Sequence, residues 1–127
     1  MKEIKFVEDI KTYDPKDAFI ARLPTNINGK EDLLKELSAK LNFPDYFGFN
    51  WDALYDCLRD LNWINQKEIV LVHDELPLLD NETLKNYINL LYMTVQDWQI
   101  SEEHQFEVVF SERYINQIEQ IRKSTSW

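Results

Sequence analysis

The chain has 127 residues, which is enough for one domain with a hydrophobic core and too few for two domains of ordinary size. It contains 44% hydrophobic and 13% aromatic residues, with two glycines and four prolines, which excludes a disordered or low-complexity chain. Fourteen Lys and Arg against 23 Asp and Glu give a net charge of −9. This charge argues against nucleic-acid binding, which depends on neutralising phosphates, and favours a basic partner. We expect a single globular domain over residues 1–127, monomeric when free.

The cysteine content and the hydropathy bear on location. Cys57 is the only cysteine, so an intramolecular disulfide framework and a zinc site built on several cysteines are excluded. Residues 1–14 are charged throughout, unlike a signal peptide, and no window approaches the ~18 apolar residues of a membrane span. We therefore expect a cytoplasmic protein with no membrane contact, no metal and no cofactor.

The first predicted elements are a strand and a helix. Residues 18–23, AFIARL, form a short apolar run ended by Pro24, which predicts a buried strand. Asn28 stands three residues before Glu31, the spacing of a helix cap followed by an acid in the first turn. The apolar residues that follow have helical spacing: Leu33, Leu34, Leu37 and Leu41. A first amphipathic helix is predicted here.

A second helix is predicted after the break at Pro44 and Gly48. Asn50 is a suitable N-cap residue. The apolar residues beyond it fall on one helical face: Ala53, Leu54, Cys57, Leu58 and Leu61. We interpret Cys57 as a small hydrophobic core residue and not as a nucleophile.

The second half predicts a strand, a long helix and another strand. Residues 68–73, EIVLVH, are β-branched and apolar, and 105–110, QFEVVF, have similar composition. Between them, Asp80 or Asn81 caps a helix. Its apolar positions are Leu84, Ile88, Leu91, Val95 and Trp98. His73 and His104 match no catalytic or metal-ligand spacing, so we interpret both as structural or solvated.

The order β-α-α-β-α-β predicts an α/β fold. Strands separated by helices require crossover connections, so we expect a small three-stranded parallel sheet packed against helices. The segment 3–7, EIKFV, is a candidate for an extra edge strand. A closing helix is suggested by Tyr114, Ile115, Ile118 and Ile121.

The second predicted helix carries charges that folding does not need. Asp52 and Asp56 are four residues apart, and like charges at this spacing destabilise a helix by about 0.2–0.5 kcal/mol. Asp52 lies in the first turn, where the helix dipole favours an anion, but Asp56 does not. Asp60 extends the stripe, and Arg59 is placed for an i,i+3 pair with Asp56. Aromatic residues surround these acids, as at an interface: Tyr46, Phe47, Phe49 and Tyr55.

This region resembles the barstar family, bacterial inhibitors of small secreted ribonucleases. Residues 41–61 read LNFPDYFGFNWDALYDCLRDL and follow the family's loop and helix without a gap. Over about residues 18–110 the order of elements also agrees. The resemblance implies a protein that is not an enzyme and that blocks the active site of a basic ribonuclease, of the secreted or toxin type, with carboxylates that mimic the RNA phosphate.

The resemblance also implies roles for individual residues. The Asp56 carboxylate would occupy the centre of the nuclease cleft, and Asp52 would bind beside it. Tyr46 would cover the region of the catalytic histidine, and Tyr55 stands where the family's best-known member carries Trp. Gly48 would permit a positive φ between the two helices. The expected partner-binding set is Tyr46, Gly48, Phe49, Asn50, Asp52, Tyr55, Asp56, Arg59 and Asp60.

Two residues depart from the family's best-known member, so the partner surface is expected to differ. Phe49 stands where that member carries an acid, and Trp51 replaces a smaller aliphatic residue. Glu102 and Glu103 are further candidates for the interface, although their alignment is not fixed.

Three alternatives use the same acids. The first is an acidic binding module whose basic partner is not a nuclease. The second is a hydrolase with Asp52 and Asp56 as paired carboxyls, but both share one exposed helix face without an apolar pocket to raise one pKa. The third is a divalent-cation site that includes Asp60, and a straight helix spreads such oxygens along its axis instead of around an ion.

Overall fold

In the part of the chain that the structure describes, the sheet has four strands, all parallel. The computed structural model describes residues 3–98 and 102–123. The strand order is β1 (Lys5–Val7), β4 (Gln105–Ser111), β3 (Glu68–His73) and β2 (Ala18–Leu23). The predicted count of three strands is wrong, because the candidate N-terminal segment pairs with β4 and supplies the fourth. The α/β class is confirmed.

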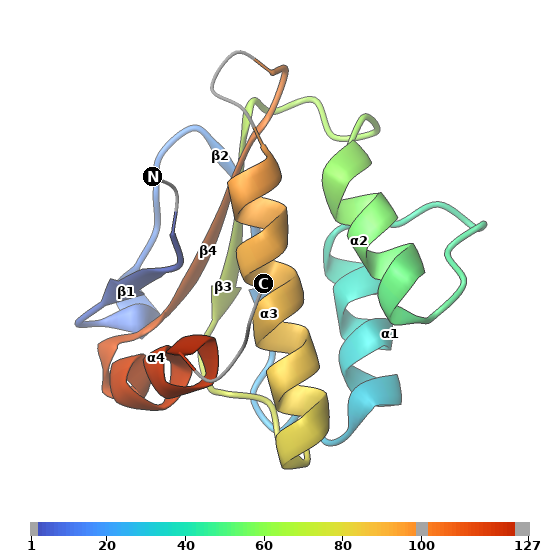
Figure 1. The fold of residues 1–127 in the computed structure, drawn as a ribbon. Coiled ribbons are helices and arrows are strands. Elements are labelled where there is room, and N and C mark those ends of the chain that lie inside the picture. The colour runs from blue at the N-terminus through green and yellow to red at the C-terminus, as the bar shows by residue number, and fades with distance from the viewer. Residues whose placement is uncertain (1–2, 99–101, 124–127) are drawn as a thin grey trace.

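Four α-helices accompany the sheet within residues 3–98 and 102–123: α1 (Lys30–Lys40), α2 (Trp51–Asp60), α3 (Asn81–Asp97) and α4 (Ile115–Lys123). The first three lie on one side of the sheet, and α4, the predicted closing helix, packs beside α3 at the end of β4 (Figure 1). Two short 3-10 helices, 10–12 and 112–114, complete the described elements. No helix within the described residues has the length and apolar character needed to cross a membrane.

The central strand β3 is buried on both faces, as parallel sheets require. Ile69 and Leu71 belong to the main core, which the three helices cover. Val70 and Val72 point to the other face and form a second cluster with Val109 and Ile10. The second face is closed by the segment 8–17, which runs from β1 at one edge of the sheet to β2 at the other.

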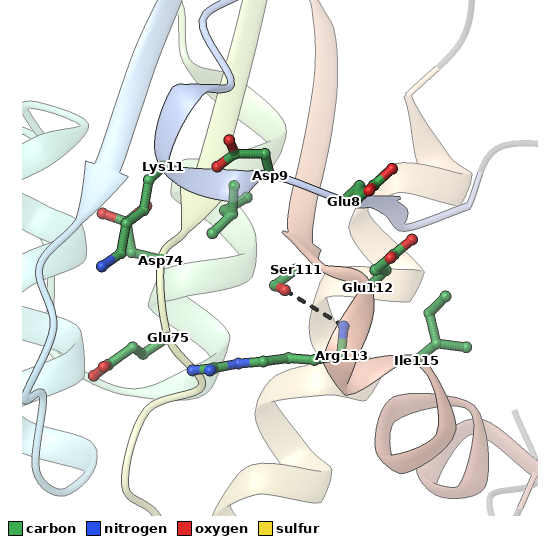
Figure 2. Close-up of a pocket in the computed structure, with 10 residues that line it drawn as sticks. Glu8, Asp9, Lys11, Asp74, Glu75, Ser111, Glu112, Arg113 and Ile115 are labelled. Carbon is green, nitrogen blue, oxygen red and sulfur yellow. Dashed lines mark hydrogen bonds between the residues drawn. The ribbon is translucent and has the colours of Figure 1, made fainter.

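The carboxyl ends of β1, β3 and β4 border an open pocket of about 580 Å³ (Figure 2). Acids dominate its wall, although Lys11 and Arg113 also line it, and the Arg113 side chain reaches across toward Glu75. Ser111 accepts a hydrogen bond from the Arg113 backbone N–H at 3.4 Å. None of the residues predicted to bind a partner lines this pocket.

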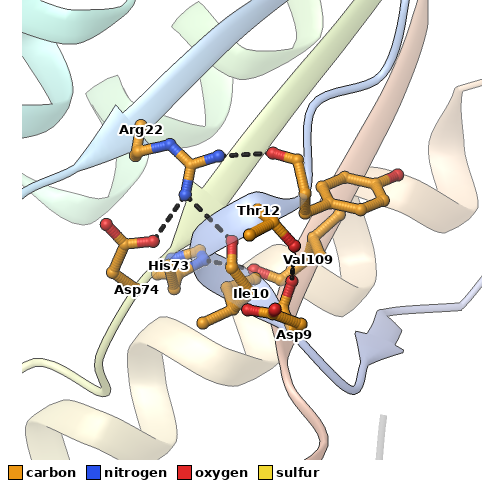
Figure 3. Close-up of polar contacts among 8 residues, drawn as sticks. Asp9, Ile10, Thr12, Arg22, His73, Asp74 and Val109 are labelled. Carbon is orange, nitrogen blue, oxygen red and sulfur yellow. Dashed lines mark hydrogen bonds and ion pairs between the residues drawn. The ribbon is translucent and has the colours of Figure 1, made fainter.

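Arg22 ties the segment 8–17 to the sheet (Figure 3). Its guanidinium pairs with Asp74 at 2.6 Å and donates to the backbone oxygens of Ile10, at 3.1 Å, and of Tyr13. Tyr13 in turn donates its hydroxyl proton to Glu107 at 3.0 Å. Arg22 on β2 and Glu107 on β4 therefore both hold this covering segment in place.

The helix caps are only partly those predicted. The N-cap of α1 is Gly29, at a φ of 92°, and not Asn28. The backbone N–H of Asn28 donates to Asp32 Oδ2 at 3.0 Å, so an acid of the first turn still closes this end. For α3 the cap is Asp80, whose Oδ1 accepts from the Thr83 N–H at 2.7 Å.

Of the two interpretations that the sequence left open for the histidines, structural or solvated, the structure supports the structural one. His73 is fully buried, with Nδ1 3.2 Å from the Val109 carbonyl oxygen and Nε2 2.6 Å from the Tyr87 hydroxyl. Because a carbonyl only accepts, Nδ1 carries the proton and Nε2 accepts from Tyr87. Burial lowers the pKa of His73 to about 3. His104 is also buried, with Nδ1 2.9 Å from the Gln66 carbonyl oxygen.

Candidate functional site

Helix α2 is fixed at its start and along its inner face. The Asn50 side chain caps it, with Oδ1 accepting from the Ala53 N–H at 2.8 Å, as predicted. Leu54, Cys57 and Leu58 are buried against the main core, and burial raises the pKa of the Cys57 thiol. The core reading of Cys57 is confirmed. With one face anchored in this way, the opposite face projects from a rigid support.

That opposite face carries three exposed carboxylates, Asp52, Asp56 and Asp60, which we call the acidic face of α2. Asp60 is 3.5 Å from the Tyr46 hydroxyl, at the outer limit of a hydrogen bond. The side-chain carboxylates of Asp52 and Asp56 make no hydrogen bond or ion pair with any residue in the described part of the chain. Both carboxylates are therefore available to an external cation.

Tyr55 lies between these acids and is held by a residue that the sequence did not reveal. Its hydroxyl donates to Asp97 at the end of α3, and this bond raises the pKa of the phenol. Asp97 is 42 positions away in the chain, so no local pattern signals the contact. An open groove of about 490 Å³ runs beside it, lined by Trp51, Asp52, Tyr55, Asp56, Asn86, Leu90 and Met93.

Arg59 has a different partner from the one predicted. Its guanidinium pairs with Glu102 at 3.4 Å and lies 4.3 Å from the centre of the Trp98 ring. The predicted pair with Asp56 is wrong, because the stacking on Trp98 draws the side chain toward the end of α3. Glu102 is half-buried in this contact, whereas Glu103 is exposed.

The loop before α2 presents two exposed aromatic side chains. Tyr46 is 70% exposed and Phe49 is 52% exposed, while Phe47 between them is buried. Next to Asn50 the left-handed backbone is at Phe49, with a φ of 52°, and not at Gly48. The predicted role of Gly48 is therefore wrong, and a Cβ there would meet only ordinary contacts at 3.4 Å and beyond.

Trp51, the second departure from the family pattern, is half-buried at the start of α2. One side of its ring system stacks on Tyr87 at a centroid distance of 6.3 Å. Lys30 Nζ lies 4.7 Å from the ring centre. Trp51 therefore packs between the helices and also lines the groove that borders the acids.

Two comparisons with known proteins bear on the family of this chain. Residues 20–111 match the family model described as Barstar (barnase inhibitor). The chain belongs to the barstar family. A curated relative from Bacillus subtilis (strain 168), described as "Putative ribonuclease inhibitor YrdF", is 34% identical over 80 residues. That alignment covers 62% of this chain and 82% of the relative.

The barstar match includes the acidic face and leaves out both ends of the described chain. Strand β1 and the 3-10 helix 10–12 precede its first residue, and α4 follows its last. All three elements lie away from α2. Strand β1 is at the edge of the sheet, the 3-10 helix covers the second face, and α4 packs beside α3. The surface that carries Asp52 and Asp56 therefore belongs to the part of the chain that the family shares.

Proposed function

We propose that this barstar-family protein inhibits a ribonuclease by docking the acidic face of α2 into the enzyme's active site. The observation that carries the proposal is the pair of exposed carboxylates, Asp52 and Asp56, which have no partner among the described residues and project from a helix anchored in the core. Asp56 lies beyond the first turn and repels Asp52 four residues away, so a role outside folding accounts for Asp56 better.

The chemistry of the expected target supports this role. A ribonuclease that cleaves through a cyclic phosphate gathers Arg, Lys and His around the scissile phosphodiester. Carboxylates can occupy the place of that phosphate, and Arg binds a carboxylate through two parallel hydrogen bonds. The acids of α2 would therefore meet several cations at once.

The contacts that hold α2 in place lower the free-energy cost of binding a partner. A segment that must be ordered on association loses conformational entropy, so a helix that is ordered beforehand retains more of its interaction energy. The Asn50 cap and the buried residues Leu54 and Leu58 hold the helix. The bond from Tyr55 to Asp97 fixes the aromatic side chain between the two acids.

A direct test is inhibition of a panel of small secreted bacterial ribonucleases that includes barnase, the enzyme named in the family's description. We expect at least one to be inhibited at one-to-one stoichiometry, with a complex visible by gel filtration. If no member is inhibited while a basic protein without nuclease activity is bound tightly, the chain is an acidic binding module and not a nuclease inhibitor.

The association rate with the inhibited nuclease should fall steeply as salt is added. A protein of net charge −9 that meets a positive cleft is steered at long range. The Debye length shrinks from about 10 Å at 0.1 M to about 3 Å at 1 M salt, so steering is lost over this range. Stopped-flow mixing measures the rate, and a rate that does not respond to salt would contradict electrostatic capture.

A further inference from the structure

The backbone of Phe49 is unusual among the described residues. Five residues other than glycine have a positive φ: Asp17, Asn26, Asn42, Phe49 and Leu61. Asn and Asp enter the left-handed region at low cost, whereas a bulky side chain there is strained. Leu61 is fully buried and ends α2, with its N–H bonded to the Cys57 carbonyl, so packing accounts for its conformation. Phe49 is 52% exposed.

The folded chain gains little from a phenylalanine at this position. One part of the ring contacts Phe47, with ring centroids 4.7 Å apart, and about half of the side chain remains in solvent. A glycine or an asparagine would adopt the φ of 52° with less strain. Folding alone therefore does not account for the exposed ring and the strained backbone together.

The position of Phe49 supplies a reason. It directly precedes Asn50, the cap of α2, and stands three residues before Asp52, which places this exposed residue next to the N-terminal end of the acidic face. Because the Asn50 cap fixes the start of the helix, the backbone that carries the ring is held beside the acidic face. Aromatic side chains at such places dominate the binding energy of many interfaces.

We propose that Phe49 determines specificity, by docking its exposed ring on an apolar patch of the ribonuclease next to the basic cleft. The acids would recognise the cleft that nucleases of this kind share. The ring would select those nucleases whose cleft is bordered by apolar surface. This inference rests on the proposed inhibition and names a property of the partner that the charges do not define.

The test compares Phe49→Asn with Phe49→Tyr on the nuclease that the wild-type protein inhibits most tightly in the panel. Phe49→Asn removes the ring and relieves the left-handed strain, so the thermal midpoint should not fall, while the inhibition constant should rise by more than tenfold. Most of this change should appear in the dissociation rate. It should persist at high salt, because an apolar contact is not screened. Phe49→Tyr keeps the ring and should retain both stability and inhibition.

The possible outcomes separate this inference from the proposed function. If Phe49→Asn inhibits as well as the wild-type protein while Asp56→Ala does not, inhibition stands and the role of Phe49 is wrong. If Phe49→Asn lowers the thermal midpoint and its folded fraction still inhibits fully, the ring is structural. A loss of inhibition that vanishes at high salt would contradict an apolar contact. If the wild-type protein inhibits no member of the panel, both proposals are contradicted.

Discussion

Asp56→Ala should reduce inhibition of the partner ribonuclease by more than tenfold while leaving the thermal midpoint unchanged or slightly higher. The side chain of Asp56 is exposed and lies four residues from both Asp52 and Asp60, so its removal relieves two repulsions in α2. Alanine is also the best helix former. On docking, however, the cations of the nuclease would be desolvated with no anion to meet them, which costs about 2–5 kcal/mol. Thermal melts and inhibition titrations measure the two effects.

Cys57→Ala is the matched control, because it changes the next residue on the inward face of the same helix. Cys57 is 2% exposed, so its truncation leaves a small cavity and should lower stability by about 1 kcal/mol. The folded fraction should inhibit normally. If Asp56→Ala unfolds the protein, the acid is structural. If it folds and still inhibits, the contact that blocks the nuclease lies elsewhere.

The elements that the sequence predicted well have strong local patterns. The strands 18–23 and 68–73 have the predicted bounds, because short apolar runs bordered by polar and turn residues can be recognised without tertiary information. Helix α2 begins after the predicted cap Asn50, whose side chain needs only the neighbouring backbone N–H groups. Strand β1 has only a weak local pattern, because it contains three residues and pairs with Val109 and its neighbours, about a hundred positions later.

The errors at the candidate site have two causes: contacts between distant parts of the chain, and reliance on residue type at Gly48. Arg59 was expected to pair locally with Asp56, but Trp98 and Glu102 provide a ring face and a carboxylate that the helix pattern does not reveal. The partner of Tyr55 was missed for the same reason. At Gly48 the expectation followed residue type, since glycine is the usual left-handed residue, whereas the structure places that conformation at the next residue.

The pH dependence of stability should show a loss of about 2–3 kcal/mol between about pH 6.5 and pH 4.5, caused by His73. Burial lowers its pKa from the ordinary 6.5 to about 3, so the folded protein keeps the ring neutral while the unfolded chain takes up a proton. The contribution is fully present above pH 6.5 and is lost progressively as pH falls toward 3. Urea unfolding at several pH values measures this slope.

Two variants assign that slope to the buried ring. His73→Gln stays neutral at every pH and offers an amide to the Tyr87 hydroxyl, so it should lose stability at pH 7 but show a much flatter profile down to about pH 4.5. Tyr87→Phe removes the hydroxyl partner and leaves His73 buried. Because burial is the cause of the lowered pKa, this variant should keep the wild-type slope. Asp80, whose pKa is lowered by its hydrogen bonds to Thr83, affects stability only in more acidic solution. A slope that survives in His73→Gln would mean that carboxylates, and not the histidine, control acid unfolding in this range.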